Sequence, residues 1–106
     1  MAKYLVKARY TQEGVKGLLK EGGTGRRGAI EKVLTGMGGS LEAFYYVFGD
    51  DDALLIVSLP DNASAAALSL TVGAAGGATC TTHVLLTPEE LDAAGKTSVD
   101  YRAPGR

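Results

Sequence analysis

The sequence predicts an α+β domain built around one antiparallel sheet, and three observations support this prediction. Four segments enriched in aromatic and β-branched residues alternate with two helical patterns in the order strand, helix, strand, strand, helix, strand. Glycine, proline or aspartate separates most of these segments, as turns and helix ends require. The chain has 106 residues, 45% of them hydrophobic, which suffices for one compact core. We therefore expect a single domain over residues 1–95 and a polar tail over residues 96–106.

The first strand and helix are predicted from the amino-terminal third of the chain. Apolar and charged side chains alternate over Lys3–Tyr10, which indicates a strand with one buried face. Thr11 suits the N-cap of the helix that follows, until the glycines of Gly22–Gly25 interrupt the helical spacing. Thr24 can cap a second segment, whose apolar stripe ends at Gly38. The pattern predicts a broken or kinked helix.

The remaining elements follow from similar patterns. Ser40–Phe48 and Ala53–Leu59 favour strands and flank a turn, so they predict a hairpin. An alanine-rich helix is predicted from Asn62 to about Ala75, and a fourth strand at Thr79–Leu86. TPEE at Thr87–Glu90 is a capping box with proline at the first helical position, which opens a short helix. This order is that of the ferredoxin-like βαββαβ fold, with a four-stranded antiparallel sheet and a short C-terminal helix and tail added.

One face of the predicted sheet is expected to be apolar without a helix to cover it. If Tyr4, Val6 and Ala8 face the helices, the other face receives the alternate residues of the first two strands. These are Leu5, Lys7, Arg9, Phe44, Tyr46 and Phe48, or the neighbours of these aromatics. The third strand, ALLIVSL, is apolar on both faces. We therefore expect a homodimer through the sheet face, with Lys7, Arg9 and Glu42 pairing as partly buried charges.

Composition and charge argue against several classes of protein. The 11 basic and 12 acidic side chains give a net charge of −1, so nucleic acid is not an expected partner. No apolar run is long enough to span a bilayer, so no membrane is expected either. The single cysteine, Cys80, cannot form an internal disulfide, and charges interrupt what would be the apolar core of a signal peptide. The expected compartment is the cytoplasm.

Over most of its length the chain resembles the GYD family. The resemblance rests on KYLVKARYTQEGVKGLL, on GGTGRR with the helix after it, and on the hairpin followed by PDNASAAALSL. Members are small bacterial proteins named for a signature of glycine, any residue, tyrosine and aspartate at this hairpin. Gly49 and Asp52 match the ends of the signature, whereas Asp51 stands where the tyrosine is expected. A role of that tyrosine is therefore not carried over to this chain.

The resemblance implies a fold and an assembly more than an activity. Such proteins are similar to the dimeric α+β barrel group, which agrees with a sheet-to-sheet dimer. The family has no established activity, and the wider group includes cofactor-free oxygenases, isomerases and haem-degrading enzymes. We expect a dimeric small-molecule-binding or structural protein, and the alternative is a cofactor-independent oxygenase or isomerase. A third interpretation is a regulatory subunit whose tail, with Tyr101 and Arg102, docks on a partner.

Two short motifs have both a functional and a structural interpretation. Asp50, Asp51 and Asp52 could bind a cation, but adjacent residues point in different directions and Gly49 precedes them, so the pattern favours a turn. GTGRRG from Gly23 interrupts a helix instead of following a strand, which argues against a dinucleotide site. Its two arginines could hold an anion beside a helix start, or could be exposed at a helix break. They are Arg26 and Arg27.

Five polar side chains are the expected contacts of a small organic ligand between sheet and helices. They are Lys7, Arg9, Tyr10, Tyr46 and His83. His83 is the only histidine of the chain, and it could be a general base, a haem ligand, part of a small-molecule pocket or a structural residue. The aromatic residues of the strands fit a ligand cavity or a dimer interface. No metal or cofactor is expected, because no second histidine or nearby acidic residue accompanies His83.

Overall fold

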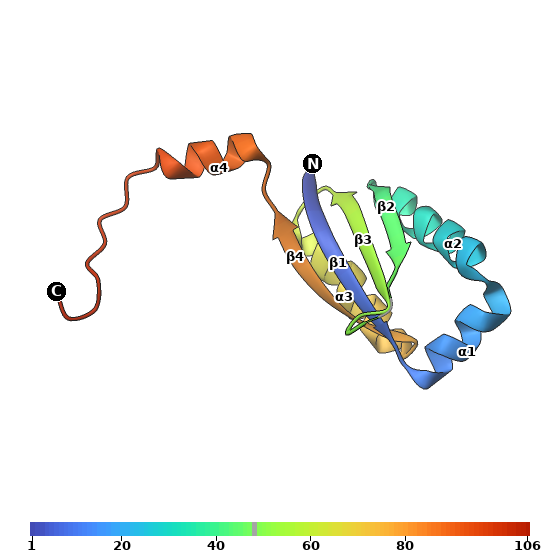
Figure 1. Cartoon of the computed structure of the whole chain (residues 1–106). Coiled ribbons are helices and arrows are strands. Elements are labelled where there is room, and N and C mark those ends of the chain that lie inside the picture. Colours follow the sequence, from blue (N-terminus) through green and yellow to red (C-terminus); the bar gives the residue numbers. More distant parts are fainter. Residues whose placement is uncertain (48) are drawn as a thin grey trace.

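The protein has the predicted α+β fold in a computed structural model that describes residues 1–47 and 49–106 (Figure 1). Its elements are β1 (Ala2–Tyr10), α1 (Gln12–Glu21), α2 (Gly23–Gly36), β2 (Ser40–Tyr46), β3 (Ala53–Leu59), α3 (Asn62–Ala75), β4 (Ala78–Leu85) and α4 (Pro88–Gly95). The strands form one four-stranded antiparallel sheet in the order β2-β3-β1-β4. This order, with α2 and α3 behind the sheet in Figure 1, is compatible with a ferredoxin-like fold.

The break between α1 and α2 differs in detail from the prediction. Thr11 caps α1 as expected, since its hydroxyl accepts a hydrogen bond from the Gly14 amide at 3.1 Å. Gly22, and not Thr24, is the N-cap of α2. Gly22 has a positive φ of 85° that ends α1, and its carbonyl accepts from the amide of Arg26 at 3.0 Å. Thr24 therefore lies inside the first turn of α2.

The other helix ends confirm the sequence patterns. Asp61 caps α3 by accepting the Ser64 amide at 2.8 Å, and this bond, with the Ser64 hydroxyl, lowers the pKa of Asp61. Gly76 ends α3 with φ 82°, in the left-handed region that glycine adopts without strain. Thr87 and Glu90 form the predicted capping box of α4.

The core lies between the sheet and the two helices α2 and α3. Its buried side chains are Tyr4, Val6, Ala8, Leu34, Ala53, Leu55, Val57, Leu59 and Ala65. Residues 4, 6 and 8 of β1 belong to this core, as alternation predicted. The Tyr4 hydroxyl donates to Asn62 Oδ1 at 2.6 Å, so this fully buried phenol has a hydrogen-bond partner on α3.

A β-bulge changes the faces of the second strand. The register of β2 against β3 shifts between Leu41 and Ala43. After the bulge Phe44 pairs with Leu55 on the helix side, and Tyr45 takes the opposite side. One extra residue in a strand reverses the alternation beyond it, so counting by twos from the start of β2 fails.

The sequence left open whether Phe44, Tyr46 and Phe48 or their neighbours face away from the helices, and the structure places a neighbour there. Phe44 and Tyr46 lie on the helix side, and the neighbour Tyr45 lies on the uncovered side, where its side chain is 70% exposed. Phe48, predicted to end the strand, lies outside the described residues. The sheet thus has most of its aromatic side chains beside the helices.

The sheet face without helices is called the open face below. Its side chains, by register, are Lys3, Leu5, Lys7, Arg9, Ser40, Ala43, Tyr45, Leu54, Ile56, Ser58, Thr79, Thr81, His83 and Leu85. Of these only Ser58 is buried. Glu42 pairs with Lys3 at 2.9 Å, and not with Lys7 or Arg9 as predicted. The antiparallel register places Glu42 near Ser58 and Lys3, about four strand residues away from Lys7.

Residues 86–106, called the C-terminal arm below, extend away from the sheet (Figure 1). Every residue from Pro88 to Arg102 is exposed. Thr87 has extended backbone angles, so the chain continues past β4 without turning back. In the part of the chain that the structure describes, no helix has the length and apolar character needed to cross a membrane.

Candidate functional site

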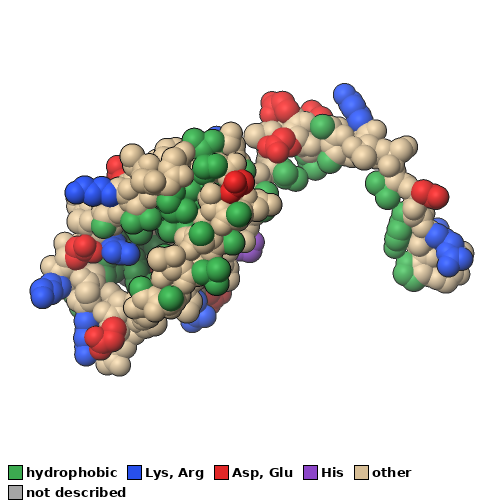
Figure 2. Space-filling view, turned by 180° about the vertical axis from the view of Figure 1, so that it is seen from behind, with side chains coloured by type: hydrophobic (Ala, Val, Ile, Leu, Met, Phe, Trp, Pro, Cys, Tyr) green, Lys and Arg blue, Asp and Glu red, His purple; other side chains and the backbone are tan. Residues whose placement is uncertain are grey.

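A cleft lies on the helix side of the sheet, between α1 and α2 on one side and α3 on the other. Figure 2 shows it as a hollow in which hydrophobic side chains gather between two ridges. It has an inner chamber of about 60 Å³ and an outer part of about 760 Å³. Both parts share the residues Tyr10, Arg26, Ile30, Leu68, Val72 and Ala78, so they are continuous. The outer volume lies within the range of ordinary small-molecule sites.

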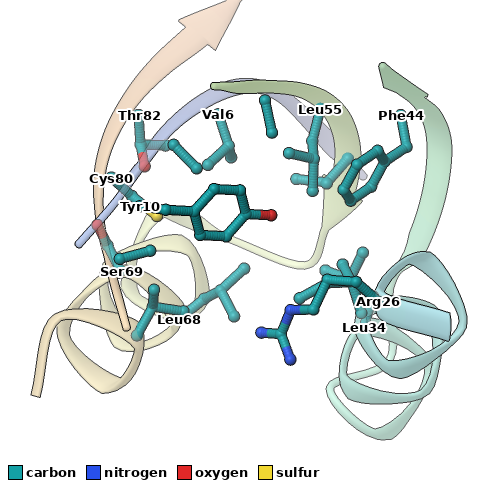
Figure 3. Close-up of a pocket in the computed structure, with 16 residues that line it drawn as sticks. Val6, Tyr10, Arg26, Leu34, Phe44, Leu55, Leu68, Ser69, Cys80 and Thr82 are labelled. Atoms are coloured by element: carbon teal, nitrogen blue, oxygen red, sulfur yellow. The ribbon is translucent and has the colours of Figure 1, made fainter. Parts of the chain in front are cut away.

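The inner chamber is mostly apolar because the sheet and both helices turn core side chains toward it. Figure 3 shows Val6 and Leu55 on the sheet side, Phe44 beside β2, and Leu68 on α3. Its few polar groups include the thiol of Cys80, whose pKa is raised by burial. Cys80 is therefore a protonated thiol at neutral pH, and not an activated nucleophile.

Tyr10 lies where the two parts of the cleft meet. It is the last residue of β1, and its ring extends across the inner chamber in Figure 3. Burial raises the pKa of Tyr10, and the phenol of Tyr46 and the carboxylate of Asp52 act in the same direction. The guanidinium of Arg26 acts in the opposite direction. At neutral pH the Tyr10 hydroxyl is therefore a hydrogen-bond donor.

Asp52 fixes the backbone of Tyr10. Its Oδ2 atom accepts the Tyr10 amide at 2.8 Å, and its own amide donates to the carbonyl of Ala8 at 2.9 Å. Its carbonyl accepts the amide of Val47 at 2.9 Å, which closes the β2–β3 loop. Asp52 thus joins the hairpin to the end of β1 and holds the residue on which the cleft is centred.

Tyr46 connects the hairpin to the helix break. Its hydroxyl donates to the carbonyl of Gly23, the first residue of α2, at 3.0 Å. A Cβ at position 23 would lie 3.0 Å from the Tyr46 ring, so glycine allows the ring to approach this closely. Burial is the main cause that raises the pKa of Tyr46. Its ring also packs edge-on against Phe44, with centroids 5.0 Å apart.

Arg26 is the basic group that lines both parts of the cleft. It extends from the first turn of α2 toward the Tyr10 ring, as Figure 3 shows. Its Nη1 atom lies 3.9 Å from the carboxylate of Glu21, and both side chains are partly exposed. Arg27 instead pairs with Glu31 at 3.2 Å along the exposed surface of α2 and does not line the cleft.

The structure separates the five expected ligand contacts into two groups. Tyr10 and Tyr46 lie on the helix side and approach each other there. Lys7, Arg9 and His83 belong to the open face, because Lys7 pairs with Leu54 and Thr81, and His83 with Leu5. A sheet lies between the two groups, so one small molecule does not contact all five side chains.

The three residues assigned to the family motif lie at the tip of the hairpin. Gly49 is exposed, and Asp51 and Asp52 are partly exposed. Of these, Asp52 has the structural contacts described above. Among the described residues, no group of three or more histidine, cysteine, aspartate or glutamate side chains could hold a metal ion.

Sequence reasoning missed Arg26 as a partner of Tyr10, and missed the apolar residues of α3 that face it, such as Leu68 and Val72. An available indication was the spacing of Arg26 and Ile30, which places both on one face of α2. The alanine-rich composition of α3 concealed the larger residues that line the cleft.

The fold and the cleft define a class of protein, namely a small ferredoxin-like α+β domain with an apolar cavity between its sheet and its helices. The family model described as GYD domain matches residues 4–94 of the 106-residue chain. The chain therefore belongs to the GYD domain family. No curated protein and no solved structure gives a significant match to it.

Proposed function

We propose that this protein binds a small, largely apolar molecule with one anionic group in the helix-side cleft. The main support is the position of Arg26, a basic side chain in the wall shared by the apolar inner chamber and the outer part of the cleft. Cavities of this kind bind ligands through apolar contacts, and a few polar groups set the orientation.

The ligand would place its apolar part in the inner chamber and its anionic group beside Arg26. The ion pair of Arg26 with Glu21 is long, at 3.9 Å, and partly exposed, so a carboxylate or sulfonate can compete for the guanidinium. The protonated hydroxyl of Tyr10 would donate a second hydrogen bond. The inner chamber of about 60 Å³ limits the buried part to a narrow group such as a short alkyl chain.

We further propose a cytoplasmic homodimer formed through the open face. Support for the dimer comes from the apolar residues of that face, because Leu5, Leu54 and Ile56 lie in adjacent strands without a covering helix. Support for the compartment comes from the single cysteine, Cys80, since the fold needs no oxidising environment for a disulfide.

The alternative, a cofactor-independent oxygenase or isomerase, has less support. His83 belongs to the open face, across the sheet from the cleft. The raised pKa of Tyr10 favours hydrogen-bond donation over proton abstraction at neutral pH. Binding without a chemical step is therefore the function that we propose.

Fluorescent probes can test this proposal. We expect 8-anilinonaphthalene-1-sulfonate to bind the folded protein, and Arg26→Gln to weaken its binding by about tenfold or more, because a charged hydrogen bond is lost. The neutral analogue N-phenyl-1-naphthylamine should bind both proteins equally well. Alkanoates of increasing length should displace the sulfonate probe from the original protein.

Arg27→Gln is the matched control, because Arg27 is one residue away, has the same charge and lies outside the cleft. It should leave the affinity for both probes within about twofold. Equal losses in the Arg26 and Arg27 variants would show that net charge, and not the cleft, attracts the probe. Circular dichroism should confirm that both variants fold.

A further inference from the structure

We infer that, when the open faces of two copies stack, the C-terminal arm of one copy lies at the end of the other copy's open face, where its acidic helix α4 neutralises Lys7 and Arg9. This inference rests on the homodimer proposed above and adds the orientation of the two copies and the residues that meet. Three observations support it, namely the charges of the open face, the charges of the arm, and the direction in which the arm leaves the sheet.

The open face has its unneutralised charge at one end. Lys3 is paired with Glu42, but among the described residues no carboxylate lies within 4 Å of the side-chain nitrogens of Lys7 or Arg9. Their neighbours on β4 are uncharged, because Lys7 pairs with Thr81 and Arg9 pairs with Thr79. The acidic hairpin tip is also at this end, beside β1 on the side away from β4, and its Asp52 carboxylate accepts the Tyr10 amide instead of pairing with Lys7 or Arg9. Two open faces that met with the same ends together would bring four cations close to one another, which is unfavourable.

The arm has the opposite charge and an apolar component. Its helix α4, PEELDAAG, contains three carboxylates and no basic residue. Leu86 and Leu91 are 58% and 62% exposed, and further along the arm Val99 and Tyr101 are 76% and 72% exposed. Large apolar side chains at this exposure on an otherwise unpacked segment are typical of a surface that is buried in an assembly.

The direction of the arm favours a second copy over its own sheet. The arm begins after Leu85, which pairs with Lys3, whereas Arg9 pairs with Thr79 at the other end of β4. Six strand residues separate these ends, a distance of about 20 Å. Because Thr87 is extended, α4 continues away from its own Lys7 and Arg9, as Figure 1 shows.

A two-fold axis that runs across the strands keeps the cations of the two copies apart and brings each arm toward Lys7 and Arg9 of the other copy. It stacks the open faces with their strands antiparallel, so that β4 of one copy lies over β4 of the other with its direction reversed. The root of each arm then lies beside Lys7 and Arg9 of the other copy. Glu89 and Asp92, in the first two turns of α4, are the carboxylates that we expect to meet these cations, because Glu90 already bonds the Thr87 amide in the capping box.

Charge reversal in the full-length chain tests these contacts. We expect Lys7→Glu with Arg9→Glu, and separately Glu89→Lys with Asp92→Lys, to weaken dimerisation by about tenfold or more each, measured by sedimentation equilibrium. The two sets of changes combined should restore the dimer to within a few fold of the original. Lys32→Glu on the exposed surface of α2 is the control for net charge and should leave the dimer unchanged.

Carbodiimide cross-linking then identifies which arm is in contact. Copies grown on light and heavy nitrogen are mixed, and Lys7 should cross-link to Glu89 or Asp92 in pairs that join a light and a heavy peptide. Cross-links only within one copy, or a dimer that is insensitive to charge reversal, would overturn the inference while the open-face dimer stands. A monomer at all concentrations would reject both, and the probe measurements on the cleft would be unaffected.

Discussion

Single side chains define the geometry of the cleft through their backbone partners. Asp52 is the clearest case, because its carboxylate holds the amide of Tyr10 and its backbone contacts β1 and the end of β2. The sequence alone predicted that the three consecutive aspartates turn a corner, which is correct for the loop but omits this contact. The reason is that the partner amide is 42 residues away along the chain, and no local pattern indicates such a contact.

Replacing Asp52 tests this role. We expect Asp52→Ala to lower the free energy of unfolding by about 1.5–3 kcal/mol, because a hydrogen bond to a charged acceptor is lost and an amide is left without its partner. Chemical denaturation provides the measurement. Asp50→Ala, two residues earlier at the exposed tip, is the control and should change stability by less than about 0.5 kcal/mol. Similar losses in both variants would contradict the role of Asp52.

At the scale of elements, the sequence predicted the helices and strands well and their facing residues less well. Alternation correctly assigned β1, where Tyr4 and Val6 are buried, because that strand is regular. It could not decide which aromatic residues of β2 face the helices, because the β-bulge before Phe44 reverses the pattern and nothing in SLEAFYY marks the extra residue. The five expected ligand contacts lie on both faces of the sheet, because Tyr10 alternates with Lys7 and Arg9 along β1 and the β-bulge turns Tyr46 to the helix side. Capping patterns were more reliable, because a cap depends only on residues within one turn.

The cap of α3 leads to a pH dependence. The pKa of Asp61 is below its ordinary value of 3.8 in the folded protein, so the unfolded chain binds the proton more tightly. The stability that Asp61 contributes is therefore present above that value and is lost as the pH falls through the folded pKa. In Asp61→Asn, which retains a capping side chain, the difference in thermal midpoint from the original should be largest near neutral pH and shrink below pH about 4.

Asp100→Asn is the matched control for this titration, because it removes the same charge from the exposed arm without affecting a helix start. Thermal midpoints of the three proteins would be compared between pH 2 and pH 7. A difference between Asp61→Asn and the original that stays constant over this range would show that the carboxylate does not stabilise α3.

At the scale of the whole molecule, the fold depends on a close approach between the start of α1 and the turn that joins α3 to β4. The first turn of α1 meets the turn between α3 and β4, where the amide of Thr11 donates to the carbonyl of Gly77 at 3.0 Å and its hydroxyl donates to that of Gly76 at 2.8 Å. A Cβ on Gly14 would collide with the carbonyl oxygen of Gly77. The contact between α1 and the α3–β4 turn therefore requires glycine at position 14.

Two alanine substitutions in α1 separate this packing effect from helix propensity. Gly14→Ala should destabilise the protein by about 1–3 kcal/mol, because the backbone of α1 must move away from the turn at Gly77. Gly17→Ala, one turn further along with no neighbouring atom within 4 Å, should stabilise it by about 0.5–1 kcal/mol. Thermal and denaturant unfolding would measure both. A neutral or stabilising Gly14→Ala would mean that α1 does not approach the α3–β4 turn as closely as described.

The strict alternation of β1 has a consequence for how this protein can change over time. Its even-numbered residues contribute to the core and the cleft, and its odd-numbered residues belong to the open face. Inserting or deleting one amino acid within this strand would exchange the two sets, moving Lys7 and Arg9 among apolar side chains and core residues into water. Changes of two residues would preserve both sets. We therefore expect natural variants of β1 to differ in length only by even numbers.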